Sequence, residues 1–182
     1  MRALFGKYRS VVRFVLLFLG SYLILSFLYA GYLQLSKGGA YAPDFITHLV
    51  AKQSSDMITG FGYKATVIPS TTAPIMELYV NSKYLARIIE GCNAISIIIL
   101  FMAFIIAFYE KRKKTILFLL AGAVLIYAMN VLRIVILAIA LYEFPEQKEI
   151  LHGVVFPGLI YGMVFLLWML WVRTLKPRKA DG

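Results

Sequence analysis

The sequence predicts an all-α integral membrane protein: a four-helix transmembrane bundle with a small extracytoplasmic α/β cap between the first and second spans. Two observations lead to this fold class. Hydrophobic residues make up 61% of the 182 residues and charged residues only 15%, which is far too apolar for an ordinary soluble domain. The apolar residues also gather in four long stretches, at 11–35, 93–109, 115–132 and 150–172.

Each stretch is close to the length that a membrane-spanning helix needs, about 20 residues for about 30 Å of hydrocarbon. The last three stretches contain no Asp, Glu, Lys or Arg, and the first contains only Arg13, near its start. The second is short unless its helix begins near Glu90. The third is expected to continue past Arg133 to about Leu141.

Residues 1–35 are predicted to be a retained signal-anchor helix. Their basic start is similar to that of a secretory signal, but the apolar core is longer than the 7 to 15 residues typical of one, and no clear small-residue cleavage site follows.

The formal net charge of +10 is concentrated at the ends of the predicted spans. Basic clusters lie at 2–13, 111–114 and 173–179, the positive-inside pattern of membrane proteins. With four spans, all three clusters fall on one side, so both termini and the 176–182 basic tail are expected in the cytoplasm. The distribution favours contact with membrane lipid and argues against nucleic acid as a partner.

The outer segment, 36–91, is predicted to be a cap that rests on the membrane helices, because it is too small to bury much core alone. Apolar residues at helical spacing predict a helix over 44–58, with Asp44 as its N-cap. Residues 63–68 and 75–80 are expected to form a β-hairpin. Residues 82–91 are expected to form an amphipathic helix that leads into the core, 92–175.

Three polar residues interrupt the apolar pattern of this predicted three-helix core: Cys92, the single cysteine, Arg133 and His152. Counted from the cytoplasmic ends of their spans, all three lie about 27 to 31 Å along their helices. A thiol, a guanidinium and an imidazole are therefore predicted at one level, near the outer edge of the hydrocarbon.

These residue types suit nucleophilic catalysis. A histidine can take the proton of a thiol or stabilise the thiolate, and an arginine can stabilise an oxyanion that forms on an attacked carbonyl. Asn130, one helical turn from Arg133, is expected to orient it or to add a donor. Glu90 could tune His152 or pair with Arg87. Asn93 is a further polar neighbour of Cys92 and a candidate supporting residue.

Each residue also has a structural interpretation. Cys92 could be a small buried hydrophobic residue, Arg133 could extend its charge to the interface, and His152 could be an interfacial residue at a helix start. Asn130 could serve only as a hydrogen-bonding contact between helices. An arginine inside a membrane is costly, however, and usually has a role.

The segments "EGCNA" (90–94), "NVLRI" (130–134) and "LHG" (151–153) together resemble the exosortase/archaeosortase family. The resemblance covers roughly residues 85 to 172 and implies a compact bacterial member. It implies a cysteine enzyme of the cytoplasmic (inner) membrane that processes exported proteins with a C-terminal transmembrane sorting signal. It maps the catalytic residues onto Cys92, Arg133 and His152. Two departures are Ala94, where the family often has glycine, and the single predicted span before the cysteine.

From this resemblance we expect a cysteine peptidase or transpeptidase that forms a thioester on Cys92 at the extracytoplasmic face. No metal-ligand cluster and no phosphate-binding glycine loop is present in the sequence, so no cofactor is expected. Three alternatives stay open: a non-enzymatic scaffold of an export system, a small transporter with Arg133 as an anion site, and a membrane cysteine acyltransferase.

Overall fold

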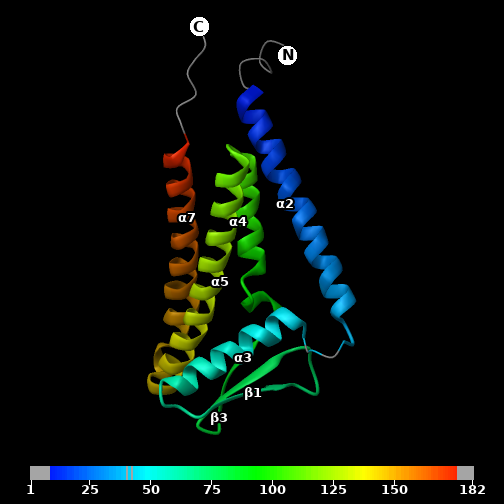
Figure 1. Ribbon diagram of the computed structural model, residues 1–182. Helices are drawn as coiled ribbons and strands as arrows, with labels where there is room; N and C mark the ends of the chain where they lie inside the picture. The colour runs from blue at the N-terminus through cyan, green and yellow to red at the C-terminus, as the bar shows by residue number, and fades with distance from the viewer. Residues whose placement is uncertain (1–8, 40, 42, 176–182) are drawn as a thin grey trace.

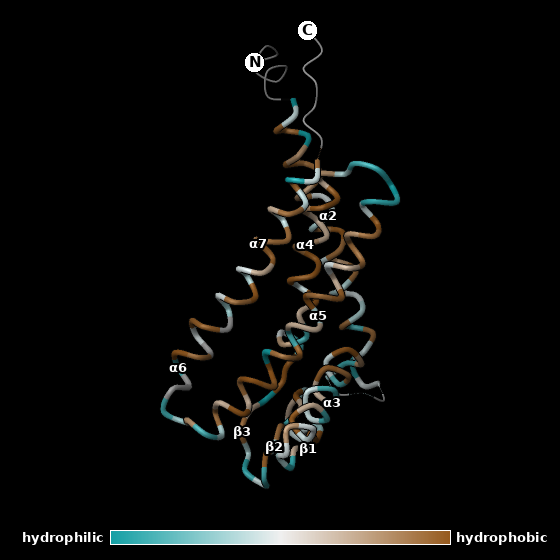
Figure 2. The backbone as a smooth tube through the Cα atoms, turned by 60° about the vertical axis from the view of Figure 1, so that its left-hand side comes forward, coloured by the Kyte–Doolittle hydropathy of each residue, from teal (hydrophilic) through white to brown (hydrophobic). Residues whose placement is uncertain are grey.

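The computed structural model describes residues 9–175, except 40 and 42. Four apolar helices run along one another, and a layer made of one helix and a small sheet closes one end of them (Figure 1). The four helices are α2 (Arg9–Ser36), α4 (Ile95–Ala107), α5 (Arg112–Glu143) and α7 (Phe156–Thr174). Hydrophobic residues run along these helices, and hydrophilic ones concentrate in the turns at their ends (Figure 2).

Three of the helices are long and apolar enough to cross a membrane: Arg9–Ser36, Arg112–Glu143 and Gly153–Thr174. They confirm a multi-pass membrane protein. The third predicted span continues past Arg133, as expected, because nothing interrupts the helix before Glu143.

The second predicted span is the exception, because α4 has only 13 residues and is about 20 Å long. A helix from Glu90 would have been longer. Instead, residues Glu90–Cys92 form a separate 3-10 turn, η1, and Ala94 adopts a left-handed conformation with φ of 63°. These two features break the helix before Ile95, so the structure supports three full spans and one shorter apolar helix.

The cap segment begins with α3 (Phe45–Gly60), close to the predicted helix. The Asp44 side chain caps it as predicted, accepting hydrogen bonds from the Ile46 and Thr47 N–H groups at 3.0 and 3.1 Å. The predicted hairpin is also present, as β1 (Ala65–Pro69) and β2 (Met76–Val80) in antiparallel register.

The helix predicted over 82–91 is wrong, because this segment forms a third strand, β3 (Lys83–Ile88), beside β2. The turn between them consists of Asn81 and Ser82, with φ of 50° and 66°. Two residues with positive φ make the type I′ turn that matches the twist of a hairpin. An apolar pattern compatible with a helix is therefore overridden by a tight turn.

Two hydrophobic cores meet at α5. The core of the cap contains residues of α3, β2 and β3 together with four residues of α5: Val131, Ile134, Val135 and Ala138. The second core lies among α4, α5 and α7 and includes Phe101, Ile126 and Trp171. The α2 helix packs along α4, where the Phe14 ring lies 4.5 Å from the Phe108 ring, centroid to centroid.

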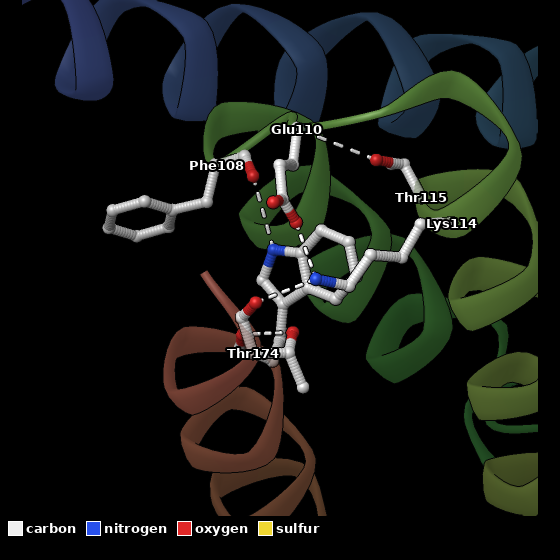
Figure 3. Close-up of polar contacts among 6 residues, drawn as sticks. Phe108, Glu110, Lys114, Thr115 and Thr174 are labelled. Carbon is white, nitrogen blue, oxygen red and sulfur yellow. Dashed lines mark hydrogen bonds and ion pairs between the residues drawn. The ribbon is translucent and has the colours of Figure 1, made fainter. Parts of the chain in front are cut away.

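At the end of the bundle away from the cap, polar contacts join the turn between α4 and α5 to the end of α7 (Figure 3). The Trp171 indole N–H donates to the Phe108 carbonyl at 3.2 Å. The Lys114 ammonium donates to the Glu110 carboxylate at 2.5 Å and to the Thr174 carbonyl at 2.6 Å. These contacts hold the turn between α4 and α5 against the last turn of α7.

Candidate active site

Cys92 is held in the 3-10 turn η1 between the end of β3 and the start of α4. Its N–H donates to the Ile89 carbonyl at 2.8 Å, and its carbonyl accepts from the Asn130 side-chain amide at 2.6 Å. Asn130 lies on α5 and is buried. The cysteine backbone is thus hydrogen-bonded on one side to the residue that follows β3 and on the other to α5, and Cys92 stays partly exposed.

Asn93 is buried on the far side of the same turn and connects three helices. Its amide donates to the Tyr29 hydroxyl of α2 at 2.8 Å and to the Thr47 hydroxyl of α3 at 3.0 Å. Its carbonyl oxygen accepts from the Ile95 N–H at 3.0 Å, at the first turn of α4. Asn93 therefore positions the turn that carries Cys92.

The next residue explains one departure from the family pattern. Ala94 has φ of 63° and ψ of 3°, the left-handed conformation that glycine adopts without strain and L-residues adopt at a cost. A glycine would fit this backbone, so alanine here departs from the pattern without removing the turn.

Cys92 and Arg133 line the same cavity, with a volume of about 470 Å³. This is within the range of small-molecule and cofactor sites in proteins. One wall consists of β3 and the residues after it, and the other consists of α5. The lining residues are Leu78, Tyr84, Leu85, Ala86, Arg87, Ile88, Ile89, Cys92, Arg133, Ile134, Leu137, Ala138 and Leu141.

Arg133 has a buried donor that is left without a partner. Its Nε atom is shielded from solvent and makes no hydrogen bond within the described part of the chain. A buried polar group without a partner is costly, and a charged one more so. Arg133 is also a lining residue of the cavity, so its guanidinium is a candidate donor to an acceptor bound there, such as a carbonyl oxygen or the oxyanion that forms from it.

For the other predicted site residues, the structure does not show the contacts that the sequence suggested. The backbone of His152 lies in a π-helical turn, Leu151–Val155, that leads into α7, and its side chain lies outside the described residues. Glu90 is exposed and, among the described residues, makes no ion pair with Arg87. Asn130 was expected to orient Arg133, but its amide binds the Cys92 carbonyl instead.

Two residues that position the turn were not predicted from the sequence: Tyr29 and Thr47, the hydroxyl partners of Asn93. Neither has a sequence signal, because a tyrosine in a span and a threonine in a helix are ordinary there. Within the described residues, no group of three His, Cys, Asp or Glu side chains is placed to hold a metal ion.

Fold and site together define a multi-pass helical membrane protein in which a single thiol and a partly buried arginine share one cavity. Residues 4–172 match the family model of the transmembrane exosortases, so the chain belongs to that family. This family membership suggests a membrane-embedded sorting protease. No curated protein and no solved structure matches the chain.

Proposed function

We propose that this protein is a membrane-embedded cysteine peptidase or transpeptidase that removes the C-terminal sorting tail of exported proteins. The observation that carries the proposal is the shared cavity of Cys92 and Arg133, which are 41 residues apart in the sequence. A nucleophile beside an unpartnered cationic donor is the arrangement that attack on a peptide carbonyl requires. Membership of the exosortase family supports the same reaction class.

In the proposed reaction, the Cys92 sulfur attacks the carbonyl carbon of the scissile peptide bond, and His152 takes the thiol proton. The negative charge that develops on the carbonyl oxygen is stabilised by Arg133. Collapse of this intermediate breaks the C–N bond, and His152 returns the proton to the leaving amine. A thioester remains on Cys92. Water, or an amine or hydroxyl acceptor, then attacks the thioester and regenerates the thiol.

The proposed location is the cytoplasmic (inner) membrane of a bacterium, with the cavity at the extracytoplasmic face. Arg13, the 111–114 cluster and Arg173 lie at the end of the bundle opposite the cap, which supports a cytoplasmic position for that end by the positive-inside rule. The tail helix of the substrate would enter the bilayer beside the bundle, and its peptide bond just outside the hydrocarbon would meet Cys92.

The test is co-expression with an exported reporter that carries a C-terminal sorting tail. Loss of the tail is measured from the mass of the reporter. Cys92→Ala is expected to abolish cleavage, and Arg133→Gln to slow it by about 10² to 10³-fold, the effect of removing one oxyanion donor. Ser96→Ala is the matched control, because this exposed hydroxyl lies one turn beyond Cys92 outside the cavity.

Three outcomes contradict the proposal or a part of it. Full cleavage by Cys92→Ala would favour a scaffold that supports another protease. Hydroxylamine releases the acyl group of a thioester on Cys92. A released fatty acyl group, in place of a peptide, would favour the acyltransferase. Labelling of Cys92 by a membrane-impermeant thiol reagent only from the cytoplasmic side would overturn the proposed topology.

A further inference from the structure

We propose that the substrate binds as an extended peptide, added as a fourth strand to the free edge of β3, which lays its scissile bond on Cys92. This inference rests on the proposed function and names how the same cavity recognises its substrate. It specifies main-chain hydrogen bonds as the source of binding, as in other cases of strand addition.

The first observation is that β3 is an edge strand. The sheet order is β1-β2-β3, so β3 pairs on one side only. An edge strand presents a row of backbone N–H and C=O groups without partners, which is a template for another strand. Outside the sheet itself, backbone hydrogen bonding in the described chain involves β3 and the residue after it only through the Ile89 carbonyl.

The register shows which backbone groups face outward. The Asn81 N–H donates to the Lys64 carbonyl at 2.7 Å, so Asn81 turns its backbone groups toward β1. Because these groups alternate along a strand, Tyr79 and Glu77 also turn toward β1. Their partners on β3 therefore make no ladder hydrogen bond to β2.

Those partners are Tyr84, opposite Tyr79, and Arg87, opposite Glu77. Their N–H and C=O groups point away from β2, toward the open edge. The two residues lie on either side of a bulge, which the register shift between Leu78 and Tyr79 marks. Bulges of this kind bend a strand and are frequent next to active sites.

The second observation is that the cavity follows this edge. Its wall includes six consecutive residues, 84–89. Successive side chains of a strand point to opposite faces, so a run of consecutive lining residues means that the cavity borders the backbone edge and not one face. The opposite wall is an apolar face of α5, which would cover an added strand.

The third observation is the position of the reactive groups. Cys92 follows the end of β3 by four residues, and Arg133, whose guanidinium is a hydrogen-bond donor, lines the same cavity. A peptide strand offers a carbonyl to such a donor at every residue. An acyl chain has no backbone groups to pair with the edge, so the strand edge favours a peptide.

The probe is acetyl-Ala-Ala-Ala-chloromethyl ketone, and the readout is the rate at which the full chain in detergent gains its mass. The thiolate displaces chloride, so a C–S bond forms as the C–Cl bond breaks. Cys92 is the single cysteine, so one mass shift reports one site. Iodoacetamide, which has no peptide backbone, measures the intrinsic accessibility of the thiol.

N-methylation of the probe at single alanines tests the pairing directly in the unaltered protein. Alternate residues of an added strand direct their N–H groups toward β3. The reaction rate of the probe methylated at the middle alanine should therefore differ from the rates of the probes methylated at the first or third alanine. The position that loses a hydrogen bond should react roughly fivefold more slowly, and the others should react as the parent does. Equal rates for all three analogues would overturn the inference.

A pair of proline variants tests the protein side. Arg87→Pro removes an outward N–H of β3 without removing a bond to β2, and should slow the peptide probe roughly fivefold but not iodoacetamide. Val67→Pro is the matched control. Val67 is opposite Leu78, whose backbone groups point toward β3, so the Val67 N–H points away from β2, at the outer edge of β1. Arg87→Pro should also react more slowly with the peptide probe than Arg87→Ala, which loses the same side chain but keeps the N–H.

The failures of the two proposals are distinguishable. If the probe reacts rapidly with Cys92 but shows no alternation with N-methylation, strand addition is wrong and the peptidase proposal stands. If the peptide probe is no faster than a non-peptide chloromethyl ketone, and the tailed reporter is cleaved equally by Cys92→Ala, the proposed function itself is wrong.

Discussion

Asn93 offers the sharpest test of how the site is held in place. Its side chain makes three hydrogen bonds, to Tyr29, Thr47 and the Ile95 N–H, and is almost fully buried. Each such bond contributes about 0.5 to 1.5 kcal/mol, so Asn93→Ala should lower the free energy of unfolding by about 1.5 to 4.5 kcal/mol. Thr47→Val removes one of the three and should cost about 1 kcal/mol.

The assay is reversible unfolding in mixed micelles, with Ser96→Ala as the exposed control three residues further along the chain, in the first turn of α4. The double variant Asn93→Ala, Thr47→Val should cost less than the sum of the single changes, because the two residues share one bond. A loss below about 0.5 kcal/mol for Asn93→Ala would refute the reasoning. Slow alkylation of Cys92 with unchanged stability would instead place Asn93 in the reaction.

Three further predictions concern the turn, the helix contact and the cap. Ala94→Val should destabilise the fold by about 1 to 2 kcal/mol relative to Ala94→Gly in thermal unfolding, because a β-branched residue is strained at φ of 63°. Gly122→Ala would place a Cβ 2.3 Å from the buried Phe101 ring, and this overpacking should lower the free energy of unfolding by about 1 to 3 kcal/mol. Adding Phe101→Leu should restore part of the lost stability. The hydrogen bond from Tyr63 to Glu143, at 2.9 Å, raises the pKa of Tyr63 above its ordinary 10.0. The stability that this bond contributes is therefore present below pH 10.0 and lost as pH rises through the raised pKa. In Tyr63→Phe, the free energy of unfolding should fall less steeply with pH in the alkaline range than in the parent protein.

Much of the fold was predictable because its signals are local. Apolar length marks the long spans, and a single aspartate marks the start of α3. The third strand was not predictable in the same way, because residues 82–91 have an apolar spacing compatible with a helix. Its decisive signal, the turn at Asn81 and Ser82, is only two residues long and lacks the usual glycine.

The proximity of Cys92 and Arg133 was predictable from the sequence, but the hydrogen bonds around them were not. Counting along the helices placed Cys92 and Arg133 at one level, and they do line one cavity. Sequence spacing also suggested that Asn130 contacts Arg133, which lies one turn away on α5. The amide instead reaches the Cys92 carbonyl on another segment. Helical spacing shows which residues share a face, but not which segment packs against that face.

The division of the cap core between α5 and the 36–91 segment has a consequence for how the protein folds and how it can be dissected. Four of the eleven buried residues in that core belong to α5. The segment 36–91 is therefore not an autonomous folding unit, because without α5 it would expose the apolar faces of α3 and β2 to water. Cap and bundle should unfold as one cooperative structure, and an excised cap should aggregate.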